Sequence, residues 1–235
     1  MLNLHFQDHE WPYEFTDHDR EVVRAIVVDD EGAFYFCRAV RDDDFGQSTL
    51  IETSGGGVEP GEDLVTAIRR ELLEELGVTV EVLAEIGLVT DYYNLIHRRN
   101  HNHYYLCRAL GFGARALTEQ EANDFHLSVL KLSYEEALLE YDKCSDSRLG
   151  RLIAQRELPV LREAARLLRE HGRTASGPAP DHAAPSAPRD AAAEKKHQLF
   201  LRQKALLDTF LSNGAISQAQ YDKSFGDLKE KMGEN

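Results

Sequence analysis

Long apolar runs, paired cysteines and an excess of basic residues are all missing from this 235-residue chain. No stretch of about eighteen apolar residues occurs, so no membrane-spanning helix is expected, and the polar first residues do not resemble a secretion signal. Three cysteines, Cys37, Cys107 and Cys144, lack the spacing of a zinc motif, and their odd number argues against a disulfide framework. We therefore expect a cytoplasmic protein with reduced cysteines and no membrane partner.

Basic residues are too few for a typical nucleic-acid-binding protein. The chain has 27 Lys and Arg against 41 Asp and Glu, a formal net charge of -14. Because cationic side chains drive most binding to nucleic-acid polymers, such a partner is not expected. A small nucleotide is compatible with this charge if a metal ion supplies positive charge locally. The hydrophobic content of 42% is sufficient for a packed core.

The most informative part of the sequence is residues 56–78, where a glycine-rich turn precedes a stretch with several acids. Apolar residues recur there at spacings of three and four, which predicts a helix. Glu71, Glu74 and Glu75 would then project from neighbouring parts of one helix surface. Like charges at this spacing destabilise a helix by about 0.2 to 0.5 kcal/mol per pair. A bound cation would reverse that effect, and an all-oxygen ligand set favours Mg2+, with Mn2+ as an alternative.

This segment resembles the signature of the Nudix hydrolase family, Gly-x5-Glu-x7-Arg-Glu-U-x-Glu-Glu-x-Gly-U, where U is a bulky aliphatic residue. A solvated acidic helix face is the plain alternative for a pair of acids, but this pattern is much longer than a pair. Every fixed position matches, and the resemblance extends over roughly residues 19–169. The matching residues are Gly56, Glu62, Arg70, Glu71, Leu72, Glu74, Glu75, Gly77 and Val78.

The resemblance implies roles for the residues of the motif. Glu71, Glu74 and Glu75 match the metal ligands of the family, and a backbone carbonyl at Gly55 or Gly56 usually completes the coordination. Arg70 and Glu62 match a pair that hold each other and orient the catalytic helix, so they are expected to be structural supports and not reacting groups.

A general base is also required to take the proton of the attacking water. Glu75 is one candidate, since it belongs to the motif. In other family members an acid on a downstream loop does this work, and Glu119, Glu121 and Asp124 lie where such a loop is expected. The sequence leaves the choice among these acids open.

The expected function is Mg2+-dependent hydrolysis of a phosphoanhydride in a nucleoside diphosphate linked to another moiety, such as ADP-ribose or a nucleotide sugar. Thr53 and Ser54 replace the Leu-Pro of the ADP-sugar lead-in, which weakens an ADP-ribose assignment. Hydrolysis of (d)NTPs or dinucleoside polyphosphates is the alternative. Two other classes are a non-catalytic Nudix module that senses a nucleotide and an interaction protein that acts mainly through its C-terminal segment. The intact set of acids favours an enzyme.

Residues outside the motif are candidates for substrate binding. Arg38 and Arg41 follow a predicted strand, and Glu52 opens the lead-in to the glycine turn. Family members often place phosphate- or nucleotide-contacting basic residues near such positions, although solvated surface arginines are an equally simple interpretation. Tyr92 and Tyr93 suit either a strand core or stacking on a base.

The run from His97 to His103 is locally basic in an otherwise acidic protein. We expect a loop here and, if it folds over the cleft, contacts from Arg98 and Arg99 to phosphates. His101 and His103 would share one face of a strand and suggest a second metal site, but no third ligand type lies nearby in sequence.

The hydrophobic pattern predicts an α/β protein. A β-hairpin is expected first, then the acidic helix, further strands and finally two helices; the corresponding ranges are 21–28, 33–40, 63–76, 80–83, 86–91, 103–110, 134–141 and 146–170. This order suggests a mixed sheet covered on both faces, an α/β/α sandwich, which is also the fold that the Nudix resemblance implies.

Composition divides the chain into three parts. Residues 1–172 form the predicted Nudix domain, and residues 173–193 carry four prolines and many alanines, which indicates a linker. Residues 194–235 are predicted to form a small αα-hairpin that resembles the short C-terminal domain known as SHOCT, with a capping box at Ser217 and Gln220. Because so short a hairpin is unstable alone, we expect it to mediate homo-oligomerisation or binding of a protein partner. A passive hairpin that packs on its own Nudix domain is the plain alternative.

Overall fold

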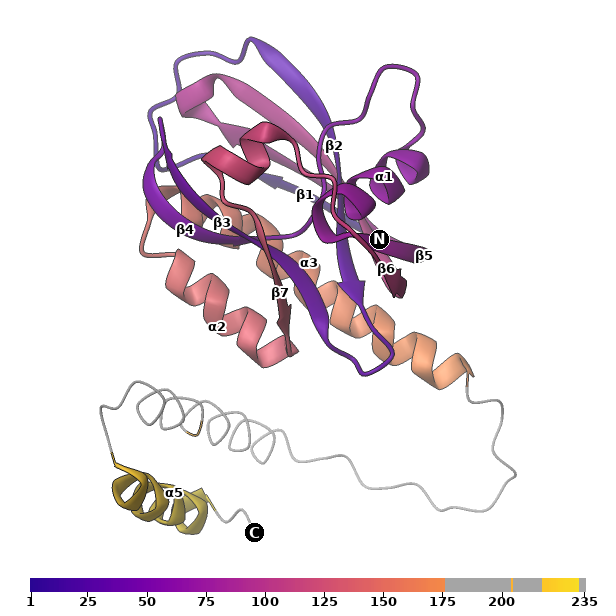
Figure 1. The fold of residues 1–235 in the computed structure, drawn as a ribbon. Helices are drawn as coiled ribbons and strands as arrows, with labels where there is room; N and C mark the ends of the chain where they lie inside the picture. Colours follow the sequence, from indigo (N-terminus) through magenta and orange to yellow (C-terminus); the bar gives the residue numbers. More distant parts are fainter. Residues whose placement is uncertain (176–203, 205–216, 233–235) are drawn as a thin grey trace. The chain divides into compact units, whose positions relative to one another are not determined.

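The structure is a computed structural model that describes residues 1–175, Lys204 and residues 217–232 (Figure 1). The chain divides into two compact units, Met1–Gly177 and Pro178–Asn235. Each unit is described by itself below. The boundaries 172 and 193 taken from composition remain predictions.

The first unit is built on a seven-stranded sheet in the order β1-β5-β6-β2-β3-β4, with β7 pairing with β3. The sheet is mixed, because β1 pairs with β5 and β2 with β6 in parallel, whereas the other pairs are antiparallel. The strands are β1 (Leu2–Phe6), β2 (His18–Val28), β3 (Phe34–Asp43), β4 (Gly46–Glu52), β5 (Val78–Tyr93), β6 (Arg98–Phe112) and β7 (Ser128–Leu132).

Helix α1 (Leu64–Leu76) covers one face of the sheet (Figure 1). It begins where the Asp63 carboxylate accepts hydrogen bonds from the N–H groups of Val65 and Thr66, and it ends at Gly77 in the left-handed region with a φ of 67°. Its apolar side packs on Val23, Ala25 and Val27 of β2 and on neighbouring strands. The range 63–76 expected from the spacing of apolar residues therefore agrees closely with the observed helix.

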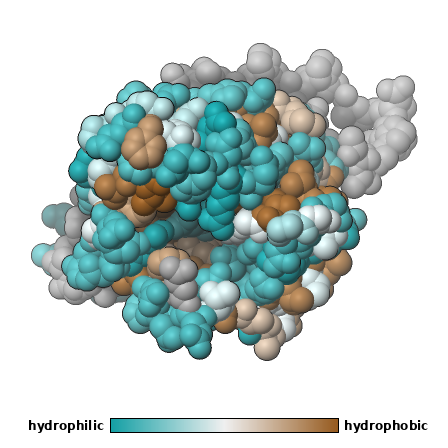
Figure 2. Space-filling view, turned by 90° about the horizontal axis from the view of Figure 1, so that it is seen from above, coloured by the Kyte–Doolittle hydropathy of each residue, from teal (hydrophilic) through white to brown (hydrophobic). Residues whose placement is uncertain are grey.

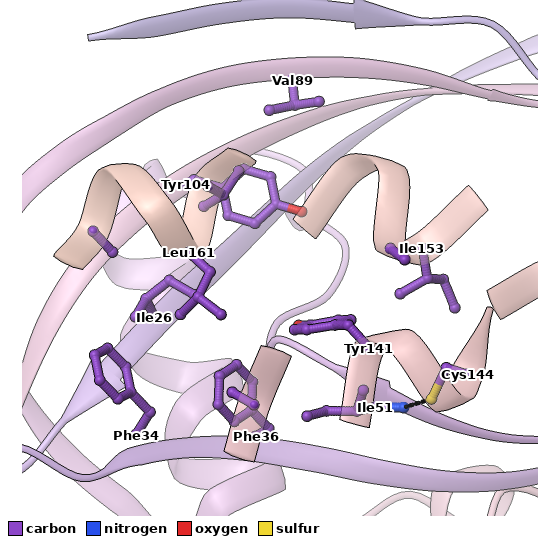
Figure 3. Close-up of a cluster of buried hydrophobic side chains, with 14 of the residues drawn as sticks. Ile26, Phe34, Phe36, Ile51, Val89, Tyr104, Tyr141, Cys144, Ile153 and Leu161 are labelled. Atoms are coloured by element: carbon purple, nitrogen blue, oxygen red, sulfur yellow. Dashed lines mark hydrogen bonds between the residues drawn. The ribbon is translucent and has the colours of Figure 1, made fainter. Parts of the chain in front are cut away.

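Helices α2 (Tyr134–Cys144) and α3 (Arg148–Ala175) cover the opposite face of the sheet. Their buried side chains form an apolar cluster with the strands, and Figure 3 shows Leu161 of α3 beside Ile26 and Tyr141 of α2 facing Phe36 of the sheet. The N–H of Ile51 donates to Cys144 Sγ over 3.3 Å in the same cluster (Figure 3). The predicted α/β/α sandwich is confirmed.

Several details of the sheet differ from the sequence prediction. The two short strands expected at 80–83 and 86–91 are one strand, β5, whose pairing with β6 shifts register at three places. Strand β1 was not predicted, because five residues of alternating burial give too short a pattern without their partner β5. Cys37 and Cys107 lie inside strands as expected, and all three cysteines are free and buried.

The second unit is described only at residue 204 and over 217–232. Helix α5 (Gln218–Met232) begins at Ser217, whose hydroxyl accepts from Gln220 N at 3.4 Å while the Gln220 side chain accepts from Ser217 N at 2.9 Å. The predicted capping box is therefore present. Most of the first helix of the predicted hairpin lies outside the described residues, so the SHOCT-like fold stays a prediction. No helix in the described ranges is long and apolar enough to span a membrane.

Candidate active site

Arg70 on α1 joins the glycine turn to the acidic face of the helix. Its Nε and Nη2 donate to the two carboxylate oxygens of Glu62 at 3.0 Å each, and Nη2 also donates to the carbonyl of Gly57 at 3.1 Å. Nη1 donates to Glu71 at 2.8 Å and to Glu74 at 3.2 Å. The hydrogen bond from Arg70 lowers the pKa of Glu62. The planar Arg70 guanidinium thus connects Gly57 and Glu62 of the loop before α1 to Glu71 and Glu74 on the helix.

Glu71 is buried against the glycine turn. An added Cβ on Gly56 would lie 2.5 Å from Glu71 Oε1, so only glycine allows this approach. The Gly56 carbonyl accepts from Val23 N at 2.9 Å, which ties the turn to β2. Burial raises the pKa of Glu71, although Arg70 partly offsets it.

Glu75 lies one helical turn further along α1 and points at the residues before the glycine turn. One of its oxygens accepts from Ser54 Oγ at 2.6 Å and from Gly55 N at 2.9 Å. Burial raises the pKa of Glu75 to about 7, and the charge of Glu71 adds to this effect, while the hydrogen bonds from Ser54 and Gly55 act in the opposite direction. The altered Thr53-Ser54 lead-in thus supplies a direct partner to a predicted ligand.

The three predicted metal ligands do not converge on one point in this structure. No group of three His, Cys, Asp or Glu side chains with metal-binding geometry exists within the described ranges. Glu71 and Glu74 are held by Arg70, whereas Glu75 is held by Ser54 and Gly55. The donor chemistry nevertheless suits a hard cation, because two carboxylates whose pKa values are both raised, mainly by burial, face one cavity. Positive charge between them would offset their repulsion.

A cavity of about 400 Å3 brings Glu71 and Glu75 together with basic and aromatic side chains, whereas Glu74 is not part of its lining. Figure 2 shows a hollow on the face viewed from above, with mostly hydrophilic side chains around it. The charged residues and large rings of the lining are Glu52, Glu71, Glu75, Glu121, Arg20, Arg24, Arg41, Arg98, Phe45, Tyr93 and Phe125. The size and mixed lining suit a nucleotide-sized ligand.

Two of the three predicted substrate-binding residues line the cavity. Arg41 lies 4.5 Å from the centre of the Phe125 ring and pairs with Asp43, and Glu52 lies between Arg24 at 3.8 Å and Arg41 at 3.9 Å. Arg38 is absent from the lining and instead pairs with Glu140 of α2 at 3.3 Å. The structure therefore supports the solvated, structural interpretation of Arg38.

Glu121 reaches the cavity from a short helical segment between β6 and β7. Its carboxylate accepts a hydrogen bond from Thr118 N at 2.7 Å, and its negative charge contributes to raising the pKa of Glu71. Of the three acids considered for this loop, Glu121 alone is part of the described cavity lining, whereas Glu119 and Asp124 are not.

The basic run after His97 is a strand, so the loop prediction was wrong. Strand β6 begins at Arg98, and because β6 pairs with both β2 and β5 it lies in the interior of the sheet. Consecutive strand residues point to opposite faces, and Arg98 lines the cavity whereas Arg99 pairs with Asp19 elsewhere. His103 binds Glu21 at 2.8 Å, and neither His101 nor His103 belongs to a metal-binding group among the described residues.

Arg20, Arg24, Phe45 and Phe125 are cavity residues that the sequence analysis missed. Arg20 and Arg24 lie four residues apart on β2 and project from the same face of the strand. Arg24 lies inside the predicted strand 21–28, and a lone charge between Val22 and Ile26 on that face is an available signal, because unpaired charge is costly to bury. Arg20 precedes the predicted strand and gives no such signal. Tyr93, which was considered for base stacking or core packing, lies in the core cluster and also lines the cavity.

Comparison with known proteins identifies the same part of the chain. A family model described as NUDIX domain matches residues 18–149. The nucleoside triphosphatase NudI of Enterobacter sp. (strain 638) is 42% identical over 60 residues, and NudI of Escherichia coli O1:K1 / APEC is 45% identical over 60 residues. Each match covers 25% of this chain and 40% of the relative. The chain thus spans less than half the length of the curated relatives it matches.

Solved structures with a similar arrangement include the E. coli ORF135 protein, which is 26% identical with a TM-score of 0.45 and covers 67% of this chain and 94% of its own. A NUDIX hydrolase from Nitrosomonas europaea is 18% identical with a TM-score of 0.44, covering 52% of this chain and 78% of its own. The matching family model spans more than half of the sequence, and the complete acidic motif lies inside it, so this protein belongs to the Nudix family of hydrolases.

Proposed function

We propose that this protein is a Mg2+-dependent pyrophosphohydrolase that cleaves a phosphoanhydride bond in a nucleotide. One observation carries the proposal: one cavity joins two Nudix carboxylates, the buried Glu71 and the half-buried Glu75, to several arginines and aromatic rings. Mg2+ bound at the acids would neutralise phosphate oxygens and favour ionisation of the attacking water. Mn2+ is the alternative ion. Glu71, Glu74, Glu75 and the backbone at Gly56 are the proposed metal-binding groups.

Residues of the protein itself would accept the proton and hold the site in shape. In the hydrolysis, the water oxygen forms a new bond to phosphorus, the bridging P–O bond breaks, and the water proton passes to a carboxylate. Glu75 is the proposed proton acceptor because it is a carboxylate of the motif and lines the cavity, and Glu121 is the alternative base on the cavity wall. Arg70 and Glu62 act as structural supports that hold the turn against α1.

Two substrate classes follow from different observations. The resemblance of the acidic motif favours a nucleoside diphosphate linked to another moiety, whereas the altered Thr53-Ser54 lead-in departs from that class and the relatives matched over 60 residues are named nucleoside triphosphatases. Arg41 and Glu52 are proposed substrate contacts in both cases. A panel of ADP-ribose, NADH, nucleotide sugars, dinucleoside polyphosphates and (d)NTPs with Mg2+, with the products identified, distinguishes the classes.

Glu75→Gln tests the proposal directly. The substitution removes a proton acceptor and a proposed metal ligand, so kcat should fall by at least about 100-fold while circular dichroism shows a retained fold. Glu81→Gln is the matched control, because Glu81 is half-exposed on β5 and pairs with Arg108 away from the cavity. A wild-type protein that binds nucleotides but turns over none of the panel would indicate a sensor module instead.

A further inference from the structure

Two arginines on neighbouring strands lie on one side of the cavity. Strands β2 and β6 pair in parallel, with His18 opposite Arg98 and Arg20 opposite Asn100. Alternate residues of a strand share a face, so Arg20 and Arg98 project from the same face of the sheet, two positions apart along it. Both side chains line the cavity, with Arg20 at its exposed rim and Arg98 half-buried.

These two arginines differ from the other arginines of the site because neither pairs with a carboxylate of the described residues. Arg24 and Arg41 share Glu52, and Arg70 holds Glu62, Glu71 and Glu74. Arg98 contacts the Tyr93 ring, 5.5 Å from its centre, and its Nε is buried without any hydrogen-bond partner. A buried guanidinium donor without an acceptor is costly, which points to an acceptor supplied by a ligand.

The charges around Arg98 also indicate that an anion would be stabilised beside it. Burial is the largest influence that lowers the pKa of Arg98, and the positive charge of Arg20 is the next. Asp91, the nearby acid that acts in the opposite direction, already accepts from Arg156 at 3.0 Å. An anion between Arg20 and Arg98 would relieve both the like-charge repulsion and the unsatisfied donor.

The pair also has a defined position relative to the carboxylates. An added Cβ on Gly57 would lie 3.0 Å from Arg20 Nη2, so the Arg20 guanidinium packs on the glycine turn. The adjacent Gly56 contacts Glu71. Arg20 is therefore at the carboxylate end of the cavity, and Arg98 continues the row of positive charge towards Tyr93. A short chain of phosphates could run from the carboxylates along these two arginines.

We propose that Arg20 and Arg98 bind the terminal phosphoryl group of a nucleoside polyphosphate and thereby select it over sugar-capped diphosphates. A terminal phosphoryl group carries up to two negative charges and three free oxygens, which match two planar guanidinium forks. A phosphate capped by a sugar carries one charge and two free oxygens. This inference rests on the proposed function, since it names the substrate class of the same site.

Steady-state kinetics with a (d)NTP and with ADP-ribose test the selection. The variants are Arg20→Gln and Arg98→Gln, and Arg99→Gln is the matched control, because Arg99 follows Arg98 directly but pairs with Asp19 outside the cavity. Wild-type kcat/KM should be higher for the triphosphate. Each cavity variant should raise KM for the triphosphate by about 10- to 100-fold and change ADP-ribose kinetics by much less. Equal losses on both substrates, or equal effects of Arg98→Gln and Arg99→Gln, would overturn the proposal.

Binding of inorganic tripolyphosphate in the presence of Mg2+, measured by calorimetry, separates this inference from the proposed hydrolysis. If no substrate is turned over, the proposed function fails, but tripolyphosphate affinity that falls at least tenfold in Arg20→Gln and Arg98→Gln, and not in Arg99→Gln, still supports the phosphate site. Because Arg20 is exposed, its variant remains informative if Arg98→Gln does not fold. A wild-type protein that does not bind tripolyphosphate would refute the site.

Discussion

Gly56 is the residue at which the glycine turn comes closest to the acids of α1. Alanine there would place a methyl carbon 2.5 Å from the carboxylate of Glu71, so either the loop or Glu71 must move. A displacement of about 1 Å in a catalytic group can cost on the order of 100-fold in rate. We expect Gly56→Ala to lower kcat by about this factor and to raise the Mg2+ concentration that gives half the maximal rate.

Gly111→Ala is the matched control for Gly56→Ala. An added Cβ on Gly111 meets only Thr79 Oγ1 at 3.6 Å, an ordinary contact, and Gly111 does not line the cavity. Its kinetics should equal those of the wild type. If Gly56→Ala had the same kcat and Mg2+ dependence as the wild type, the close approach of the turn to Glu71 would have no role in catalysis.

Helix α3 contributes a charged group to the core at a cost in desolvation. Arg156 is fully buried, with its Nη1 3.0 Å from Asp91 and its Nη2 2.9 Å from Glu157. Removing one partner of a buried ion pair typically costs about 3 to 5 kcal/mol, since it leaves uncompensated charge. We expect Arg156→Met to lower the free energy of unfolding by this amount, measured by urea denaturation.

An exposed arginine on the same helix provides the comparison. Arg166 pairs with Glu163 and Glu170 on the surface of α3, with its side chain 46% exposed. Surface pairs of this kind contribute at most about 1 kcal/mol, so Arg166→Met should change the stability little. Similar losses in both variants would indicate that the buried network is no more important than a surface pair.

The secondary elements were predictable where their signals are local. The ends of α1 follow from Asp63 and Gly77, and the opening of α5 follows from Ser217 and Gln220. Strand β6 was missed at its start because the polar run after His97 has no hydrophobic alternation, and its strand geometry comes from pairing with β2 and β5. A short sequence window contains no information about such distant partners.

The cavity exists only at the scale of the whole first unit. Glu75 lies on α1, Arg20 on β2, Arg98 on β6 and Glu121 on the segment before β7, so the site joins positions more than 100 residues apart. The motif in residues 56–78 identified the acids because they are neighbours on one helix. Arg20 was not identified, since its place beside the acids depends on the Gly56 and Gly57 turn crossing β2.

The C-terminal segment, residues 194–235, is predicted to associate and not to catalyse. Every described residue of the cavity lining lies between Arg20 and Ile153, within the first unit. A protein ending at Gly177 should therefore keep the kcat/KM of the full chain. The segment is nearly neutral, with seven Lys or Arg against six Asp or Glu, so charge repulsion does not oppose self-association. Light scattering should give an oligomer for the full chain and a monomer for the shortened protein. A monomeric full chain would exclude self-association and leave binding of another protein as the role to test.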